Sequence, residues 1–140
     1  MYLLDTNVVS ELRRRDRADP RVARWADAVD LGDLYLSVVT VLEFELGVLA
    51  VEARDAAQGR LLRRWLDERV LPAFDGRILP VDAAVAVACA RLHVPDRRPE
   101  RDALIAATAQ CHALTVVTRN RRDFAPMGVR ILDPWAAPAA

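Results

Sequence analysis

Short apolar runs alternate along this chain with longer stretches whose apolar residues recur three or four positions apart. Val22, Trp25, Ala26 and Val29 show the second pattern, which places them on one face of a helix. Alternation of the two patterns predicts an α/β domain with a mainly parallel central sheet flanked by helices. The predicted strands span residues 2–4, 34–38, 78–81, 114–118 and 129–132, and the predicted helices span 8–14, 21–29, 40–57, 60–71, 83–92 and 100–112.

A single domain accounts for the whole pattern. The 140 residues contain no internal repeat and no linker long enough to separate two domains. We expect one domain over residues 1–135 and a short Ala/Pro tail over 136–140. No apolar run approaches the roughly 20 residues of a membrane span, and no basic leader precedes the first strand. We therefore expect no membrane association and a cytoplasmic location.

Charge and cysteine content narrow the kind of site to expect. The 20 basic and 20 acidic residues cancel, so no global field attracts a polyanion. There is no lysine, and although the forked side chain of arginine suits phosphate, clustered arginines are more often a solvated face. Cys89 and Cys111 lack the spaced pairs of a sulfur metal site, and we expect two buried free thiols, with a single disulfide as the alternative. The arginines cluster at 13–15, at 97, 98 and 101, and at 119, 121 and 122.

Three acidic residues stand among aliphatic neighbours, where an ionised carboxylate is costly to bury without a compensating cation. Asp5 follows the apolar run 2–4, Glu43 lies within 41–44, and Asp102 opens the apolar stretch 103–107. Carboxylate oxygens are the ligands that hard divalent cations prefer. Together the three acids predict a metal-dependent enzyme.

The expected strand arrangement brings these acids to one edge of the sheet. In open parallel sheets, ligands bind outside the carboxyl ends of the strands. Two predicted strands end in the polar triplets Asp5-Thr6-Asn7 and Thr118-Arg119-Asn120, which should meet at that edge. Glu43 and Asp102 each fall in the first turn or so of a predicted helix that begins near the same edge.

Each acid also has a purely structural explanation. Glu43 and Thr40 match the Thr-x-x-Glu pattern of a capping box, in which the Glu side chain bonds back to the Thr backbone amide. Asp102 suits the first turn of a helix because an acid there interacts favourably with the helix dipole, although its own helical row is apolar and turns it inward. Asp5 taken alone is equally well explained as an N-cap.

Four segments, in order, resemble the PIN domain, and more narrowly the VapC/FitB-type toxins of bacterial toxin–antitoxin pairs. They are residues 3–7 (LLDTN), 35–43 (YLSVVTVLE), 102–109 (DALIAATA) and 116–120 (VVTRN). Residues 76–80 (GRILP) and 131–135 (ILDPW) are similar to the FitB-like subgroup. The resemblance covers about residues 1–135, and the ordered set is far more specific than any one segment.

The resemblance implies a magnesium- or manganese-dependent endoribonuclease that hydrolyses RNA by means of a metal-activated water. It also implies a homodimer and a small DNA-binding antitoxin as partner. The sequence leaves the dimer surface open, with the predicted helices over 40–71 as one candidate. Carried over to this chain, the resemblance gives the metal ligands Asp5 and Asp102, the further catalytic acid Glu43, and the pocket residues Thr6, Asn7 and Thr118. For the proposed cleavage we also expect Arg119 to guide the RNA backbone.

A fourth acid departs from the family pattern. Some members have an acid where this chain has Asn120, and others carry it three residues later, where this chain has Asp123. Both positions stay candidates for the catalytic site, and the number of metal ions stays open.

Two other functions compete with the nuclease. An Asp-nucleophile phosphatase has a similar first strand, but it needs a second Asp as general acid where this chain has Asn7. A PIN-like module that binds RNA or protein without cutting is disfavoured by the intact acids Asp5, Glu43 and Asp102.

Overall fold

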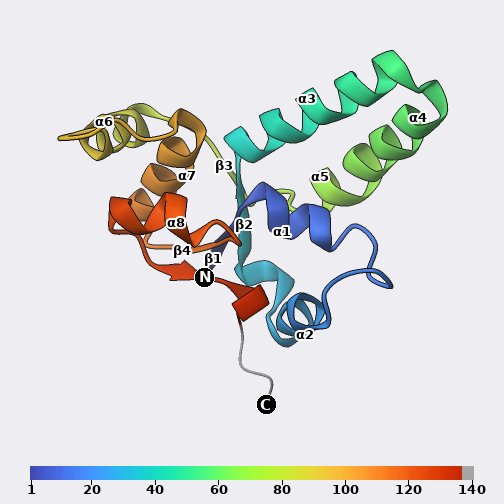
Figure 1. The fold of residues 1–140 in the computed structure, drawn as a ribbon, viewed down its shortest axis with the longest axis horizontal. Coiled ribbons are helices and arrows are strands. Elements are labelled where there is room, and N and C mark those ends of the chain that lie inside the picture. The colour runs from blue at the N-terminus through green and yellow to red at the C-terminus, as the bar shows by residue number, and fades with distance from the viewer. Residues whose placement is uncertain (137–140) are drawn as a thin grey trace.

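The computed structural model describes residues 1–136, and its centre is a five-stranded sheet in the order β3-β2-β1-β4-β5 (Figure 1). Every neighbouring pair is parallel, and every strand lies inside a predicted one, which confirms the α/β class. The chain builds outward from β1 to β3 on one side, and later from β4 to β5 on the other. The topological switch point of the sheet therefore lies between β1 and β4. The strands are β1 (Tyr2–Leu4), β2 (Leu34–Ser37), β3 (Ile78–Leu79), β4 (Thr115–Val117) and β5 (Ile131–Leu132).

Helices cover both faces of the sheet, because successive strand residues point to opposite sides. Leu3 belongs to the core that includes residues of α6 (Ala83–Leu92) and α7 (Glu100–Cys111). Leu4 belongs to the core that includes residues of α1 (Thr6–Glu11) and α2 (Pro20–Ala28). Burial of both faces is what a parallel sheet requires, and it explains why the predicted strands are apolar throughout. Both cysteines are free, as expected, but only Cys89 is buried; Cys111, the last residue of α7, is exposed.

Helix α3 (Val38–Arg54) begins two residues before its predicted start. The Ser37 side chain accepts a hydrogen bond from the Val39 N–H at 3.0 Å and so caps the helix. Strand β2 consequently ends at Ser37 and not at Val38. Thr40 is therefore inside the helix and not at its N-cap.

The predicted helix over 60–71 consists of three pieces in the structure. They are α4 (Ala56–Trp65), a π-helical turn (Leu66–Val70) and α5 (Leu71–Ala73). Pro72 has no backbone N–H to continue the α-helical hydrogen bonding, which accounts for the break.

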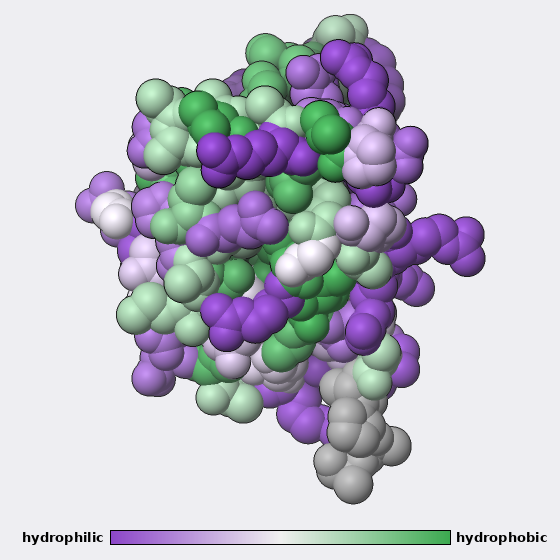
Figure 2. Space-filling view, turned by 90° about the vertical axis from the view of Figure 1, so that its left-hand side faces the viewer, coloured by the Kyte–Doolittle hydropathy of each residue, from purple (hydrophilic) through white to green (hydrophobic). Residues whose placement is uncertain are grey.

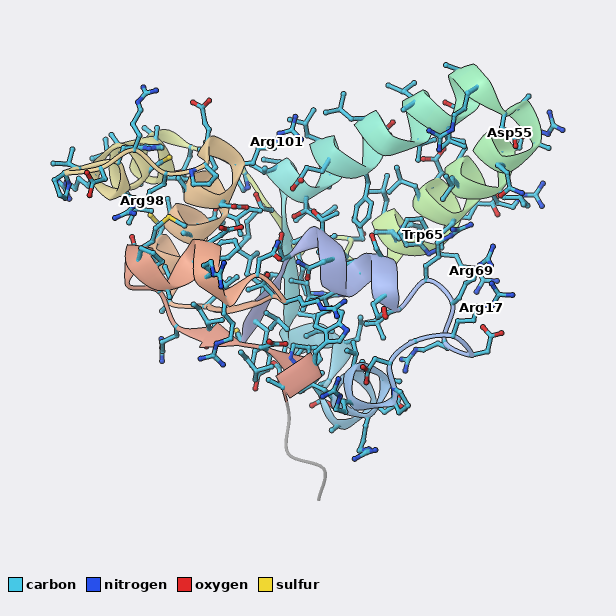
Figure 3. All side chains as sticks on the ribbon, viewed as in Figure 1. Arg17, Asp55, Trp65, Arg69, Arg98 and Arg101 are labelled. Carbon is cyan, nitrogen blue, oxygen red and sulfur yellow. The ribbon has the colours of Figure 1, made fainter. Side chains whose placement is uncertain are left out.

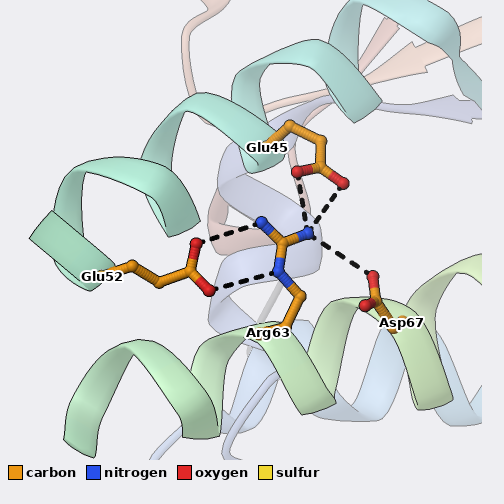
Figure 4. A network of polar contacts seen from close by, with 4 residues as sticks. All are labelled: Glu45, Glu52, Arg63 and Asp67. Carbon is orange, nitrogen blue, oxygen red and sulfur yellow. Dashed lines mark hydrogen bonds and ion pairs between the residues drawn. The ribbon is translucent and has the colours of Figure 1, made fainter. Parts of the chain in front are cut away.

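An arginine holds α3 and α4 together as a hairpin that projects from the sheet (Figure 1). Arg63 of α4 donates to Glu45 at 2.8 Å and to Glu52 at 3.3 Å, both on α3, and lies 3.6 Å from Asp67 (Figure 4). Gly59 permits this approach, since a Cβ there would lie 2.6 Å from the Cα of Glu52. The hairpin is thus fixed by charge and by close backbone packing.

Two short segments near the carboxyl terminus were not predicted. Helix α8 (Arg121–Phe124) and the 3₁₀ turn after it (Ala125–Met127) are too short for a periodic pattern to show. A final 3₁₀ turn (Pro134–Ala136) buries Trp135. The predicted tail over 136–140 lies outside the described residues except for Ala136, so the division at residue 135 stays a prediction. Within residues 1–136, no helix is both long and apolar enough to cross a membrane.

Candidate active site

The candidate site lies at the carboxyl edge of the sheet, beside the switch point. Asp5 directly follows β1 and Thr118 directly follows β4, whereas Glu43 comes from the second turn of α3 and Asp102 from the first turn of α7. Hydrogen bonds and charge interactions described below join all four segments. The sequence prediction that they meet at one edge is confirmed.

Asp5 is buried, with 5% of its surface exposed, and three donors hold its carboxylate. Oδ1 accepts from the Thr6 N–H at 2.9 Å, which makes Asp5 the N-cap of α1. Oδ2 accepts from Thr118 Oγ1 at 2.8 Å and from Asn7 Nδ2 at 3.3 Å. Burial raises the pKa of Asp5, the three hydrogen bonds oppose that rise, and the charge of Asp123 adds to it. Helix capping thus accounts for Oδ1 of Asp5 only, because Oδ2 is bound by Thr118 at the end of β4 and by Asn7.

Thr118 and Asn7 tie the ends of β1 and β4 together. Thr118 Oγ1 accepts from the Asn120 N–H at 2.9 Å and from Asn7 Nδ2 at 3.3 Å, which directs its own hydrogen to Asp5. Asn7 Oδ1 accepts from the Arg119 N–H at 3.2 Å. Both residues thereby orient Asp5, as their predicted pocket position suggests.

Glu43 does not form the capping box that its spacing from Thr40 allows. Ser37 caps α3, so the Thr40 amide lies inside the helix, and the fully buried Thr40 Oγ1 has no hydrogen-bond partner within residues 1–136. Glu43 Oε1 instead accepts from Thr6 Oγ1 at 3.0 Å. The structural explanation of Glu43 is wrong, because the helix begins earlier than the pattern indicates.

Asp102 is the acid that is most strongly perturbed. Burial and the negative charges of Asp5, Asp123 and Glu43 together raise the pKa of Asp102 to about 6. A favourable helix dipole does not explain a carboxyl group whose ionisation is opposed in this way. Asp102 therefore faces a cluster of like charges.

The structure distinguishes the two candidates for a fourth acid. The Asp123 carboxylate is close enough for its charge to raise the pKa of both Asp5 and Asp102. Asn120 is exposed at the N-cap of α8, where its side chain makes no capping bond, and its backbone N–H binds Thr118. Asp123 thus joins the acids, whereas Asn120 contributes its backbone.

Arg119 reaches the site with its backbone only. Its guanidinium lies 5.2 Å from the ring centroid of Trp135, and its charge lowers the pKa of Asp19 at the start of α2. The predicted place of Arg119 on the RNA backbone stays a prediction, now at the rim beside Trp135.

The donor set fits a divalent cation that keeps part of its water shell. Among residues 1–136, no three His, Cys, Asp or Glu side chains converge closely enough to hold a metal ion by themselves. Mg²⁺, however, is commonly bound by one or two carboxylates and several waters. Asp5 and Asp102 provide two such carboxylates. The charge of Asp123 raises the pKa of both.

The raised pKa of Asp102 predicts how the stability of the metal-free protein depends on pH. The folded state holds the Asp102 proton more tightly than the unfolded chain, whose value is near 3.8, so the free energy of unfolding falls as pH rises from about 4 to about 6. We expect a loss of about 1 kcal/mol from this group, discounted because Asp102 is partly exposed. Urea denaturation in EDTA at several pH values measures it, and the loss should be absent in Asp102→Asn. An equal loss in both proteins would contradict the prediction.

Two neighbours of the site were missed by the sequence reasoning. Arg101 Nη1 lies 3.9 Å from Glu43 Oε2, and Trp135 lies under Arg119. The position of Arg101 directly before Asp102 is a usable signal, but Arg101 also belongs to an arginine cluster, which is typical of a solvated face.

Comparison with known proteins identifies the family of the chain. The family model described as the PIN domain matches residues 2–128. The chain is 39% identical to "Toxin FitB" of Neisseria gonorrhoeae, over 96% of this chain and 99% of that protein, and 36% identical to "VapC ribonuclease Y4jK" of Sinorhizobium fredii, over 96% and 98%. Its fold matches a chain of FitAB bound to an IR36 DNA fragment with a TM-score of 0.89 and 37% identity, over 99% of this chain and 98% of that chain. The chain therefore belongs to the PIN domain family.

Proposed function

We propose that this protein is a metal-dependent endoribonuclease that acts as the toxin of a toxin–antitoxin pair. The observation that carries the proposal is the cluster of acids at the switch point, in which Asp5, Asp123 and Glu43 oppose the ionisation of Asp102. Such mutual repulsion is characteristic of a site that binds a cation during function. A ribonuclease and a toxin among full-length relatives support the reaction and the biological role.

Asp5 and Asp102 are the residues that we propose to hold Mg²⁺, for which Mn²⁺ would substitute. The chemistry supplied by a divalent cation at this position is activation of water for attack on a phosphodiester, and compensation of charge on the phosphate oxygens. The hydrogen bonds from Thr118, Thr6 and Asn7 favour the ionised form of Asp5, because they lower its pKa against the larger rise that burial causes.

Glu43 is the residue that we propose to accept a proton from the attacking water. Thr6 holds Glu43 Oε1, which orients the carboxylate and leaves Oε2 without a hydrogen bond among residues 1–136. A positioned carboxylate of this kind is suited to act as general base.

The competing functions lack comparable support. Asn7 stands where a phosphatase needs its general acid, and its amide is engaged with Asp5, Thr118 and the Arg119 backbone. A module that only binds RNA or protein has no need for the repulsion that Asp102 experiences.

We propose two protein partners. The first is a small DNA-binding antitoxin, in keeping with the relative FitAB, which was solved on a DNA fragment. The second is another copy of this chain, packed on the exposed apolar row Val38, Leu42, Leu46 and Leu49 of α3. Val87 and Val94 are also exposed, and they lie on or next to α6. On that side of the molecule, polar side chains are interspersed with the apolar ones (Figure 2).

The proposed function predicts that the purified protein cleaves RNA in Mg²⁺ and that EDTA stops the cleavage. Incubation with total bacterial RNA, followed by sequencing of the new ends, detects internal cuts in whichever RNA is the substrate. Expression of the chain without a partner should also arrest growth. RNA that stays intact in both Mg²⁺ and Mn²⁺, together with normal growth at verified soluble expression, would overturn the proposal.

A further inference from the structure

A groove of about 610 Å³ runs between the starts of α3 and α7, beside the acids of the site. Leu42 and Leu104 provide apolar walls, and three acids, Glu43, Glu100 and Asp102, line the same groove. Arg101 is the only basic residue among the groove residues that the structure describes. A polyanion that enters this groove therefore faces one positively charged side chain, that of Arg101, and the three acidic side chains.

The contact of Arg101 with Glu43 is one that a ligand can replace. Arg101 Nη1 lies 3.9 Å from Glu43 Oε2, which is a charge contact longer than a hydrogen bond, and 52% of the Arg101 side chain is exposed. Exposed ion pairs of this kind contribute little stability. Figure 3 shows Arg101 reaching from α7 toward the beginning of α3. The side chain is thus placed over the groove and only loosely held.

We propose that Arg101 binds a backbone phosphate of the RNA in this groove and moves from Glu43 to that phosphate when the substrate enters. The planar fork of a guanidinium matches phosphate oxygens in geometry and charge. The inference rests on the proposed ribonuclease function, and it assigns a substrate-binding residue to the same site.

The proposal predicts that loss of Arg101 weakens RNA binding and does not weaken Mg²⁺ binding. Loss of Arg101 removes a phosphate contact, so RNA binds more weakly. The same loss removes a positive charge next to Glu43 and Asp102, so Mg²⁺ binds as tightly as before or more tightly. A merely structural role for Arg101 would weaken both kinds of binding.

The test compares wild type with Arg101→Ala, Arg101→Lys and the control Arg60→Ala. Arg60 is exposed on α4. It lies five residues after Asp55, which is labelled at the tip of the α3–α4 hairpin in Figure 3, away from the groove. Fluorescence anisotropy with a labelled single-stranded RNA oligonucleotide, in EDTA at low ionic strength, measures RNA binding without cleavage. Calorimetric titration with Mg²⁺ alone measures metal binding.

We expect Arg101→Ala to weaken RNA binding about tenfold, as for the loss of one charge-assisted hydrogen bond. The slope of log K against log salt should fall by about 0.7, the value for one phosphate contact on a single strand. Arg101→Lys should retain part of the affinity, Arg60→Ala should match wild type, and Mg²⁺ affinity should not fall in any of them.

Unchanged RNA affinity in Arg101→Ala, a loss of Mg²⁺ binding together with RNA binding, or no RNA binding by wild type without metal would each overturn the inference. None of these results affects the ribonuclease proposal, which depends on cleavage in Mg²⁺ by the wild-type protein.

Discussion

Replacement of Asp102 by Asn is expected to reduce Mg²⁺-dependent RNA cleavage by about a thousandfold or more. Asn keeps the size of the side chain but removes one of the two proposed metal ligands, and a loss of roughly 4 kcal/mol of transition-state stabilisation corresponds to that factor. The fold should survive, because Asn also removes the repulsion from Asp5, Asp123 and Glu43. Single-turnover cleavage and urea denaturation of the same preparation measure the two effects.

A matched control is Asp82→Asn, at an exposed helix start outside the candidate site. Asp82 Oδ1 accepts from the Val85 N–H at 2.9 Å as the N-cap of α6, and Asn caps helices as well as Asp does. This variant should cleave like wild type.

Asp5→Asn should also lose cleavage, but it disturbs three hydrogen bonds, so its stability should fall as well. Cleavage by Asp102→Asn within tenfold of wild type would show that Asp102 is not a metal ligand.

Replacement of Thr118 by Val is expected to lower both stability and cleavage. Val has the same shape, but it leaves Asp5 Oδ2 and the Asn120 N–H without the fully buried hydroxyl that joins them. Stranded polar groups of this kind cost about 2 kcal/mol in the free energy of unfolding. Thr118 is also the hydrogen-bond partner that most lowers the pKa of Asp5, so Asp5 becomes a poorer ligand. Loss of such supporting partners typically reduces metal affinity or activity by about 10- to 100-fold.

Thr108→Val provides the control for that change. Thr108 is equally buried, but its hydroxyl donates at 2.8 Å to the Leu104 carbonyl of its own helix, so it supports no acid of the site. We expect cleavage by Thr108→Val to match wild type under saturating Mg²⁺. If both threonine variants lose cleavage to the same extent, the effect of Thr118 is one of general stability and not of Asp5 orientation.

The meeting of Asp5 and Thr118 could be predicted from sequence, because it depends only on strand order. Both residues follow apolar runs, and parallel strands present their carboxyl ends at one edge. In the sheet, Thr118 Oγ1 lies 2.8 Å from Asp5 Oδ2 and donates a hydrogen bond to it. Contacts of this kind, made by residues at strand ends, are determined by the backbone topology.

The partner of Glu43 could not be predicted, because it depends on where α3 begins. The Thr40 and Glu43 spacing fits a capping box, but Ser37 competes successfully for the cap and shifts the start of the helix. Only then is Glu43 placed to meet Thr6. A shift of two residues at a helix start is below what sequence patterns resolve.

The place of Asp123 and the direction of Arg119 were also beyond the sequence. Helix α8 has only four residues, so no periodicity shows that Asp123 turns toward Asp5 and Asp102. Arg119 lies over Trp135, a residue sixteen positions further on, whose burial depends on the packed carboxyl-terminal turn. Side-chain direction at such short elements is decided by tertiary contacts.

Binding of Mn²⁺ to the metal-free protein tests most directly whether these acids form one metal site. Calorimetric titration of wild type, Asp102→Asn, Asp123→Asn and Asn120→Ala separates the candidates. We predict that wild type binds Mn²⁺, that the two Asp variants bind it about tenfold more weakly or worse, and that Asn120→Ala binds it as wild type does. Equal Mn²⁺ affinity in wild type and Asp102→Asn would contradict the account.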